Sequence, residues 1–111
     1  ARRLADLVAE DADPASLLAV ADGVWTLTSL MGFEALLRGI PVTCLGTPFY
    51  AGWGLTEDHA PCPRRTARPT LDHLVWAALI AYPRYRDPVS GLACPPEVIA
   101  ARLAARTPAI A

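Results

Sequence analysis

Thr28 and Ser29 are adjacent hydroxyl residues, and they stand where a short apolar strand gives way to a predicted helix. The start of a helix leaves backbone N–H groups without partners and carries a partial positive charge, so it favours an anion. Gly32, in the first turn, would leave room for a ligand to approach. This pattern indicates a phosphate site. Hydroxyl residues at a helix start also serve as caps alone, and that alternative stays open.

Glu34 places a carboxylate in the second turn of a helix whose other side chains are mostly apolar. A carboxylate can accept hydrogen bonds from both vicinal hydroxyls of a ribose, which predicts a nucleotide ligand. The alternative is an ion pair with Arg38, four residues later on the same helical face. The two roles are compatible, and both stay open.

The segment 46–55, GTPFYAGWGL, combines aromatic residues with glycines directly after a predicted strand. Open parallel sheets bind ligands at that position, and aromatic rings there pack on the core or stack on a ligand. Phe49 is expected in the core. Tyr50 and Trp53 each carry a polar atom as well as a ring, and we predict that they contribute to the ligand site together with Gly52.

These residues depend on a β-α-β unit for their positions. The pattern predicts a strand over 23–28, a helix from Ser29 to the stop signal of Gly39 and Pro41, and a strand over 42–45. The fold class is therefore α/β. Elsewhere the sequence predicts the end of a helix over 1–10, a short helix over 16–21, a packed helix over 70–82 that includes His73 and Trp76, a turn over 83–88, and a last helix opened by Pro95.

Residues 57–69 form a polar segment broken by prolines, and they hold a cluster of three arginines, Arg64, Arg65 and Arg68. Such a cluster can bind a phosphate or carboxylate, or it can be solvated and locally paired. Asp58, His59 and Cys62 lie in the same segment without a second pair of ligands, so no metal site is expected.

The composition excludes several classes of function. The formal net charge of the 111 residues is -1, which argues against a nucleic-acid surface, and no apolar run reaches transmembrane length. No signal peptide is visible. The 3 cysteines include no C-x-x-C pair, which favours a reducing cytoplasm over a disulfide framework.

Four stretches carry a resemblance to a known family: TSLMGFEALLRG, GTPFYAGWGLTEDH, PCPRRTARPTLDHLVWAALIAYPRY and RDPVSG. Over residues 22–103 the chain resembles the bacterial capsule polysaccharide biosynthesis and export family, whose known members are β-Kdo glycosyltransferases. The resemblance implies a GT-B architecture of two Rossmann-like domains. It also implies CMP-Kdo as donor, a Kdo-primed lyso-phosphatidylglycerol acceptor, and a cytoplasmic location peripheral to the inner membrane.

On this resemblance, residues 1–111 would be the C-terminal part of the CMP-sugar-binding Rossmann-like domain, without the upstream acceptor domain. Thr28 and Ser29 would meet the CMP phosphate and Glu34 the ribose, while the 52–54 loop matches the family without assigned contacts. The catalytic group is not assigned, and no cofactor is expected beyond the donor. Two alternatives stay open: a non-catalytic capsule export or assembly module, and a sugar-nucleotide epimerase of similar fold.

Overall fold

The computed structural model describes residues 3–106 of the chain. The chain divides into two compact units, Ala1–Pro69 and Thr70–Ala111. The residues that predict a ligand site all fall in the first unit, and the second is built from helices and a short hairpin.

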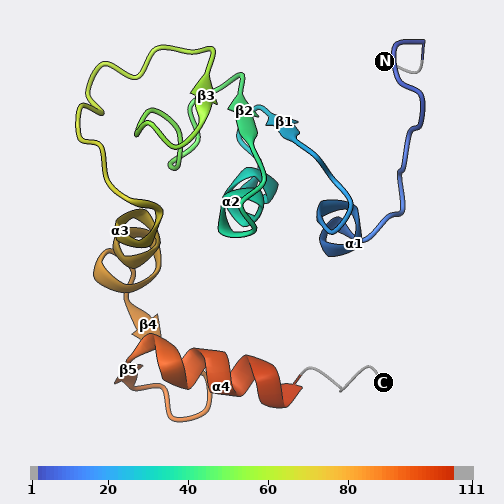
Figure 1. Ribbon diagram of the computed structural model, residues 1–111. Helices are drawn as coiled ribbons and strands as arrows, with labels where there is room; N and C mark the ends of the chain where they lie inside the picture. Colours follow the sequence, from blue (N-terminus) through green and yellow to red (C-terminus); the bar gives the residue numbers. More distant parts are fainter. Residues whose placement is uncertain (1–2, 107–111) are drawn as a thin grey trace. The chain divides into compact units, whose positions relative to one another are not determined.

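The first unit is organised around a parallel sheet in the order β1-β2-β3 (Figure 1). The first two strands confirm the predicted β-α-β unit, with Val24 paired with Val42. The third strand was not predicted, because its two residues are charged, exposed and without an apolar pattern. A long loop connects β2 to this strand, and the two strands pair in parallel. The strands are β1 (Val24–Thr26), β2 (Val42–Cys44) and β3 (Glu57–Asp58).

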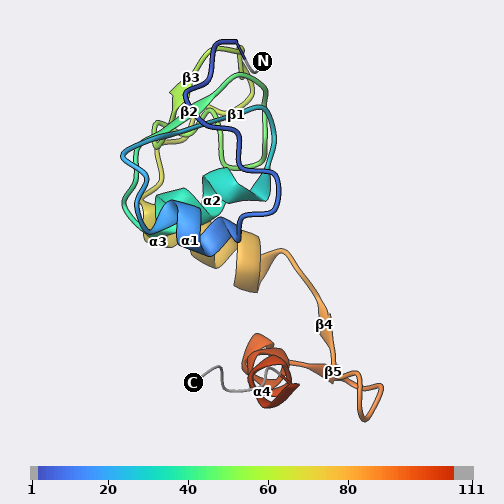
Figure 2. The same cartoon turned by 90° about the vertical axis from the view of Figure 1, so that its right-hand side faces the viewer.

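Helix α2 (Leu30–Leu37) connects β1 to β2 and packs against both strands (Figures 1 and 2). Its apolar face buries Phe33, Ala35 and Leu36. The predicted stop is confirmed, because Gly39 adopts a φ of 73°, a conformation that favours glycine and ends the helix. The helix therefore begins directly beyond Thr28 and Ser29, as the sequence predicted.

The predicted helix over 1–10 is wrong for residues 3–10, while residues 1 and 2 lie outside the described part of the chain. The apolar side chains on which the prediction rested are 94% exposed at Leu4 and 81% exposed at Leu7. A short helix needs burial of its apolar face to be stable, and that burial is missing here. The next helix, α1 (Pro14–Leu18), begins after Asp13, whose side chain accepts a hydrogen bond from the Ser16 N–H.

The second unit begins with the predicted helix capped by Thr70. His73 and Trp76 were expected to pack, but both are exposed. Residues 83–88 were predicted to form a turn, but they contain the first strand of an antiparallel hairpin that was not predicted. The last helix is present, as predicted. The elements are α3 (Leu71–Trp76), the π-helical turn η1 (Ala77–Ala81), β4 (Tyr85–Arg86), β5 (Ala93–Cys94) and α4 (Pro96–Arg106).

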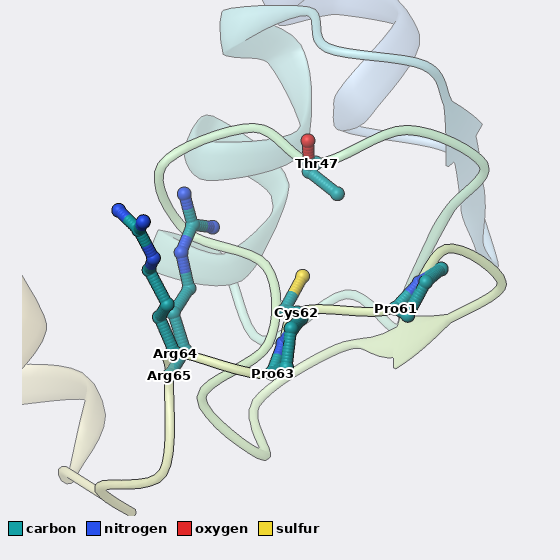
Figure 3. Close-up of a pocket in the computed structure, with 6 residues that line it drawn as sticks. All are labelled: Thr47, Pro61, Cys62, Pro63, Arg64 and Arg65. Atoms are coloured by element: carbon teal, nitrogen blue, oxygen red, sulfur yellow. The ribbon is translucent and has the colours of Figure 1, made fainter.

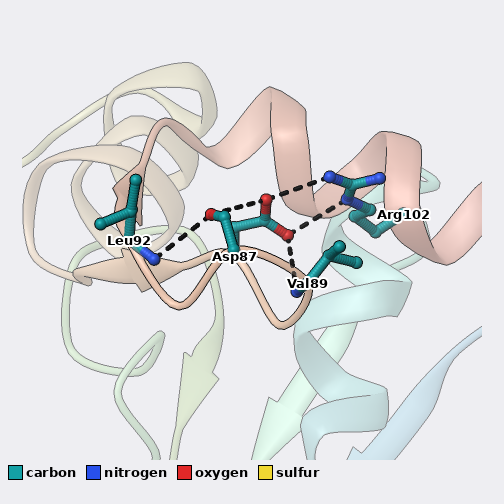
Figure 4. Close-up of polar contacts among 5 residues, drawn as sticks. Asp87, Val89, Leu92 and Arg102 are labelled. Carbon is teal, nitrogen blue, oxygen red and sulfur yellow. Dashed lines mark hydrogen bonds and ion pairs between the residues drawn. The ribbon is translucent and has the colours of Figure 1, made fainter.

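Asp87 links the hairpin to α4 within this second unit (Figure 4). Its buried carboxylate accepts hydrogen bonds from Nε and Nη2 of Arg102, each at 3.1 Å, and from the Val89 N–H and the Ser90 hydroxyl at 3.0 Å. The hydrogen bonds from Arg102, followed by that from Val89, hold the pKa of Asp87 well below its usual range. The carboxylate is thus charged and fully partnered at neutral pH.

Candidate functional site

The two hydroxyls at the start of α2 differ in their partners. The Ser29 Oγ accepts a hydrogen bond from the Met31 N–H at 3.1 Å, and the Ser29 N–H donates to the Thr26 hydroxyl at 3.1 Å. Ser29 is therefore a helix cap whose hydroxyl proton can still be donated to a ligand. Thr28 is exposed, and its hydroxyl has no hydrogen-bond partner among residues 3–106. Thr28 is the freer of the two to meet an anion.

Tyr50 lies behind this helix start and not on the surface that a ligand would reach. Its side chain is fully buried, and its hydroxyl donates to the Ser29 carbonyl oxygen at 2.5 Å. Burial raises the pKa of Tyr50, so the phenol remains a donor at neutral pH. The predicted contact of Tyr50 with ligand is therefore corrected: the polar end of the ring finds its partner in the backbone of the protein.

Phe49 shows the opposite deviation from expectation. It was expected in the core, yet 44% of it is exposed, although its ring packs 5.0 Å from that of Phe33 and 5.3 Å from that of Tyr50. The sequence pattern predicted an aromatic cluster here, but it assigned Phe49 to the core and Tyr50 to the ligand site, whereas Tyr50 is the buried ring and Phe49 is partly exposed. Which ring is buried depends on the backbone acceptor at Ser29, and the sequence gives no local signal for that acceptor.

Gly32 is required by Tyr50 in this structure. Gly32 is buried, and a Cβ atom there would fall on the Tyr50 hydroxyl and lie 2.6 Å from its Cζ. The predicted reason for this glycine was space for a ligand. The structure gives a different reason, because the Tyr50 ring already fills that space.

The loop over 46–55 is held by its own contacts. The Trp53 indole N–H donates to the Phe49 carbonyl at 2.8 Å, and the Gly52 N–H donates to the Asp58 carboxylate at 3.0 Å. Gly52 has a φ of 81°, and a Cβ atom on it would lie 2.5 Å from the Cβ of Cys62. Both predicted site residues, Gly52 and Trp53, thus have structural roles here, and their contact with a ligand stays a prediction.

The three clustered arginines have different roles. Arg65 donates from Nη1 to the carbonyls of Pro48 at 2.6 Å and Ala51 at 2.8 Å, and its guanidinium lies 5.6 Å from the Trp53 ring centroid. Arg68 donates from Nη1 to backbone carbonyls, including that of Arg65 at 3.1 Å. Arg64 is exposed and has no side-chain partner within residues 3–106. Two arginines therefore brace the loop, and one is free to bind an anion.

A pocket of about 280 Å³ lies beside this loop (Figure 3). The pocket shares a backbone segment with the helix start: Thr47 lines it, and the preceding Gly46 packs so closely that a Cβ atom would lie 3.2 Å from the Thr28 Cγ2. The pocket and the free Thr28 hydroxyl thus belong to one region at the ends of β1 and β2. The lining residues are Thr47, Pro61, Cys62, Pro63, Arg64 and Arg65.

Glu34 is half-buried on α2, and its carboxylate has no hydrogen-bond or ion-pair partner in the described part of the chain. The alternative of an ion pair with Arg38 is therefore not seen in this structure. A half-buried carboxylate without a partner is available to a ligand. The role of Glu34 toward a ribose stays a prediction.

The acidic groups of segment 57–69 are engaged locally. Asp58 also accepts from the Thr56 hydroxyl at 2.5 Å, and the His59 Nε2 lies 3.1 Å from the Glu57 carboxylate. Among residues 3–106 no group of three His, Cys, Asp or Glu side chains could hold a metal ion.

Over the same residues no helix is long and apolar enough to cross a membrane. Cys44, Cys62 and Cys94 are free thiols.

A parallel β-α-β unit with hydroxyls at the helix start and a basic pocket at the strand ends defines a small α/β unit consistent with a Rossmann-like domain. Residues 2–86 match the sequence profile of the family described as capsule polysaccharide biosynthesis protein, and the chain belongs to that family. The resemblance inferred from the sequence motifs is thereby confirmed.

Related sequences are much longer than this chain. It is 57% identical over 79 residues to the lipopolysaccharide-processing protein LpsZ of Rhizobium meliloti, covering 71% of this chain and 18% of LpsZ. It is 57% identical over 88 residues to the capsule polysaccharide modification protein LipA of Neisseria meningitidis serogroup A, covering 79% of this chain and 12% of LipA. The chain thus spans less than a fifth of these relatives.

Two solved structures resemble this chain in both sequence and fold. The β-Kdo 2,4-transferase of Thermosulfurimonas dismutans KpsC is 46% identical with a TM-score of 0.77, over 81% of this chain and 28% of that one. The β-Kdo 2,7-transferase of the same KpsC is 47% identical with a TM-score of 0.76, over 81% and 31%. The chain is thus similar to part of two Kdo transferases.

Proposed function

We propose that this chain forms the donor-binding part of a longer glycosyltransferase that transfers Kdo from CMP-Kdo onto a lipid-linked Kdo acceptor during synthesis of the capsule linker. The similarity to the two KpsC transferases over 81% of the chain carries this proposal. The two neighbours form different linkages and are almost equally similar, so the proposal names no linkage.

The site supports this role through the groups that it leaves free. The CMP phosphate would lie at the start of α2, where it meets the Thr28 hydroxyl, the Ser29 hydroxyl proton and the helix dipole. Negative charge grows on this phosphate as the bond to the sugar breaks, and preorganised donors stabilise that charge in the transition state. Glu34 would accept hydrogen bonds from the ribose.

In the proposed architecture, the chain is the C-terminal part of the nucleotide-binding domain of a GT-B enzyme. The acceptor domain of the full-length protein would supply the group that deprotonates the acceptor hydroxyl. CMP is the leaving group of an already activated sugar, so the proposed reaction needs no separate cofactor. The acceptor would be Kdo-primed lyso-phosphatidylglycerol, which places the full-length protein in the cytoplasm at the periphery of the inner membrane.

The test is to incubate the full-length protein with CMP-Kdo and Kdo-primed lyso-phosphatidylglycerol, and to measure CMP release together with the mass of the lipid product. One added Kdo per acceptor, with CMP released in equal amount, is expected. CMP binding without transfer would favour a non-catalytic export or assembly module and contradict the proposal. Isomerisation of the sugar nucleotide without acceptor would favour an epimerase. The lipid without its Kdo primer is the matched control.

A further inference from the structure

The pocket beside the loop is electropositive, and nothing in the proposed binding of CMP uses it. Two of its six lining residues are arginines and none is acidic. Arg65 already donates to two backbone carbonyls, whereas the Arg64 guanidinium keeps all its donors free within residues 3–106. A free guanidinium presents a planar pair of donors that matches a carboxylate. The chemistry of this pocket favours an anion.

The position of the pocket indicates which anion would enter it. Gly46 packs against Leu27 and Thr28, and the next residue, Thr47, lines the pocket together with Arg64 (Figure 3). The pocket is therefore within reach of a group attached to a phosphate that lies at the start of α2. In CMP-Kdo the phosphate carries two groups, the ribose and the Kdo sugar, and because the ribose is proposed to lie at Glu34, the sugar is the group left for this pocket.

Kdo is an acid sugar, and its carboxylate is attached to the anomeric carbon that carries the phosphate. The carboxylate must therefore lie close to the phosphate wherever the donor binds. We infer that this pocket is a carboxylate subsite for the transferred sugar, with the Arg64 guanidinium as its binding group. This inference rests on the proposed function, because it takes CMP-Kdo as the donor.

The bracing of the loop makes Arg64 suited to this role. Arg65 holds the carbonyls of Pro48 and Ala51, so the backbone that carries Arg64 is fixed to the far side of the loop. A charged group on a fixed backbone loses less freedom when it binds, which favours specific recognition over loose attraction. Arg64 would therefore distinguish a sugar that carries a carboxylate from one that lacks it.

The experiment compares the affinity of the full-length protein for CMP and for CMP-Kdo by calorimetry, in the wild type and in Arg64→Ala. CMP has the phosphate without the sugar carboxylate. Arg64→Ala should weaken CMP-Kdo binding by about tenfold or more, the usual size for loss of a charge-assisted hydrogen bond, and change CMP binding less than about twofold. Arg64→Lys should recover part of the loss because it keeps the charge without the planar pair of donors.

Arg38→Ala is the matched control, because Arg38 is an exposed arginine of the same unit at the opposite end of α2. It should leave both affinities unchanged. Equal weakening of CMP and CMP-Kdo in Arg64→Ala would overturn the inference by placing Arg64 at the phosphate, and no weakening of either would also overturn it. Failure of the wild type to bind CMP would overturn the proposed function, and the inference with it.

Discussion

The substitution Gly32→Ala should destabilise the protein even though alanine is the better helix former. Replacing glycine by alanine in a helix ordinarily stabilises by up to about 1 kcal/mol, the value for a helix interior. Here the added Cβ atom would fall on the Tyr50 hydroxyl and lie 2.6 Å from its Cζ. Helix propensity and local packing therefore predict opposite signs for one substitution, and the sign of the measured change decides between them.

The magnitude follows from three contributions to the free energy of unfolding. Forcing extra volume into a packed site costs about 1–3 kcal/mol. Displacing Tyr50 also breaks its hydrogen bond to the Ser29 carbonyl, which costs about 1 kcal/mol more. The gain of about 1 kcal/mol in helix propensity offsets the second contribution. The expected net destabilisation is therefore about 1–3 kcal/mol.

Hydrogen exchange in the full-length protein is the suitable assay, because it reports local stability where global unfolding involves more than one domain. Amides of α2 and of the 46–55 loop should exchange faster in Gly32→Ala. Gly23→Ala is the matched control, since the nearest atom to its added Cβ would lie at an ordinary 3.7 Å. That control should exchange like the wild type.

Tyr50→Phe tests the cause, because it removes the hydroxyl on which the new Cβ would fall. The cost of Gly32→Ala should be smaller in the Tyr50→Phe background than in the wild type, so that the double mutant is destabilised by less than the sum of the two single mutants. If Gly32→Ala leaves exchange unchanged or slows it, the contact with Tyr50 does not constrain residue 32, and the reasoning is refuted.

Three further predictions concern the free polar groups and the second unit. Thr28→Ala should weaken CMP binding by about 1–3 kcal/mol without speeding hydrogen exchange in α2. Ser29→Ala should weaken CMP binding and also speed exchange in α2, because Ser29 caps that helix. Faster exchange with unchanged CMP binding would make Ser29 only a cap. Glu34→Gln should keep the fold and weaken CMP binding, measured by calorimetry, and an unchanged affinity would remove the ribose role. Asp87→Asn should destabilise the second unit at neutral pH and make its stability less sensitive to acid. The folded protein lowers the pKa of Asp87, so the carboxylate contributes its full stabilisation above the ordinary carboxyl pKa of about 4 and loses it as the pH falls below that value. Hydrogen exchange measured against pH can follow this loss. An identical pH dependence in Asp87→Asn would contradict the role of the bonds to Arg102.

The elements that could be predicted are those with local signals. The strand at Val24, the helix beyond Ser29 and its end at Gly39 follow from apolar periodicity, a capping hydroxyl and a glycine stop. Strand β3 had no such signal, because it forms only by pairing Glu57 and Asp58 with β2. The helix predicted over 1–10 fails over residues 3–10 for the opposite reason: the apolar pattern is present, but the side chains of Leu4 and Leu7 are not buried.

In the candidate site, too, only the features with a local sequence signal could be predicted. The hydroxyls at the helix start are a local feature, and the structure places them there. The partners of Tyr50 and Arg65 are backbone carbonyls that lie 14 to 21 residues away along the chain. Contacts over such separations are set by the tertiary fold, so the sequence could not tell the buried tyrosine from a ligand-binding one, or a bracing arginine from the free Arg64.

The long-range contacts give the residues of the 46–55 loop a structural role. In the 46–55 loop, Tyr50 bonds to the helix start and Trp53 to the loop backbone, while Gly52 fits beneath Cys62. Each of these residues constrains another, so one substitution disturbs several contacts, and its first effect should be on stability. The polar side chains of Thr28, Glu34 and Arg64 have no such partners in the part of the chain that the structure describes, and their substitution should act first on binding. We therefore expect the loop to act mainly as a rigid support for a few polar residues, and we predict that those residues determine the specificity of the site.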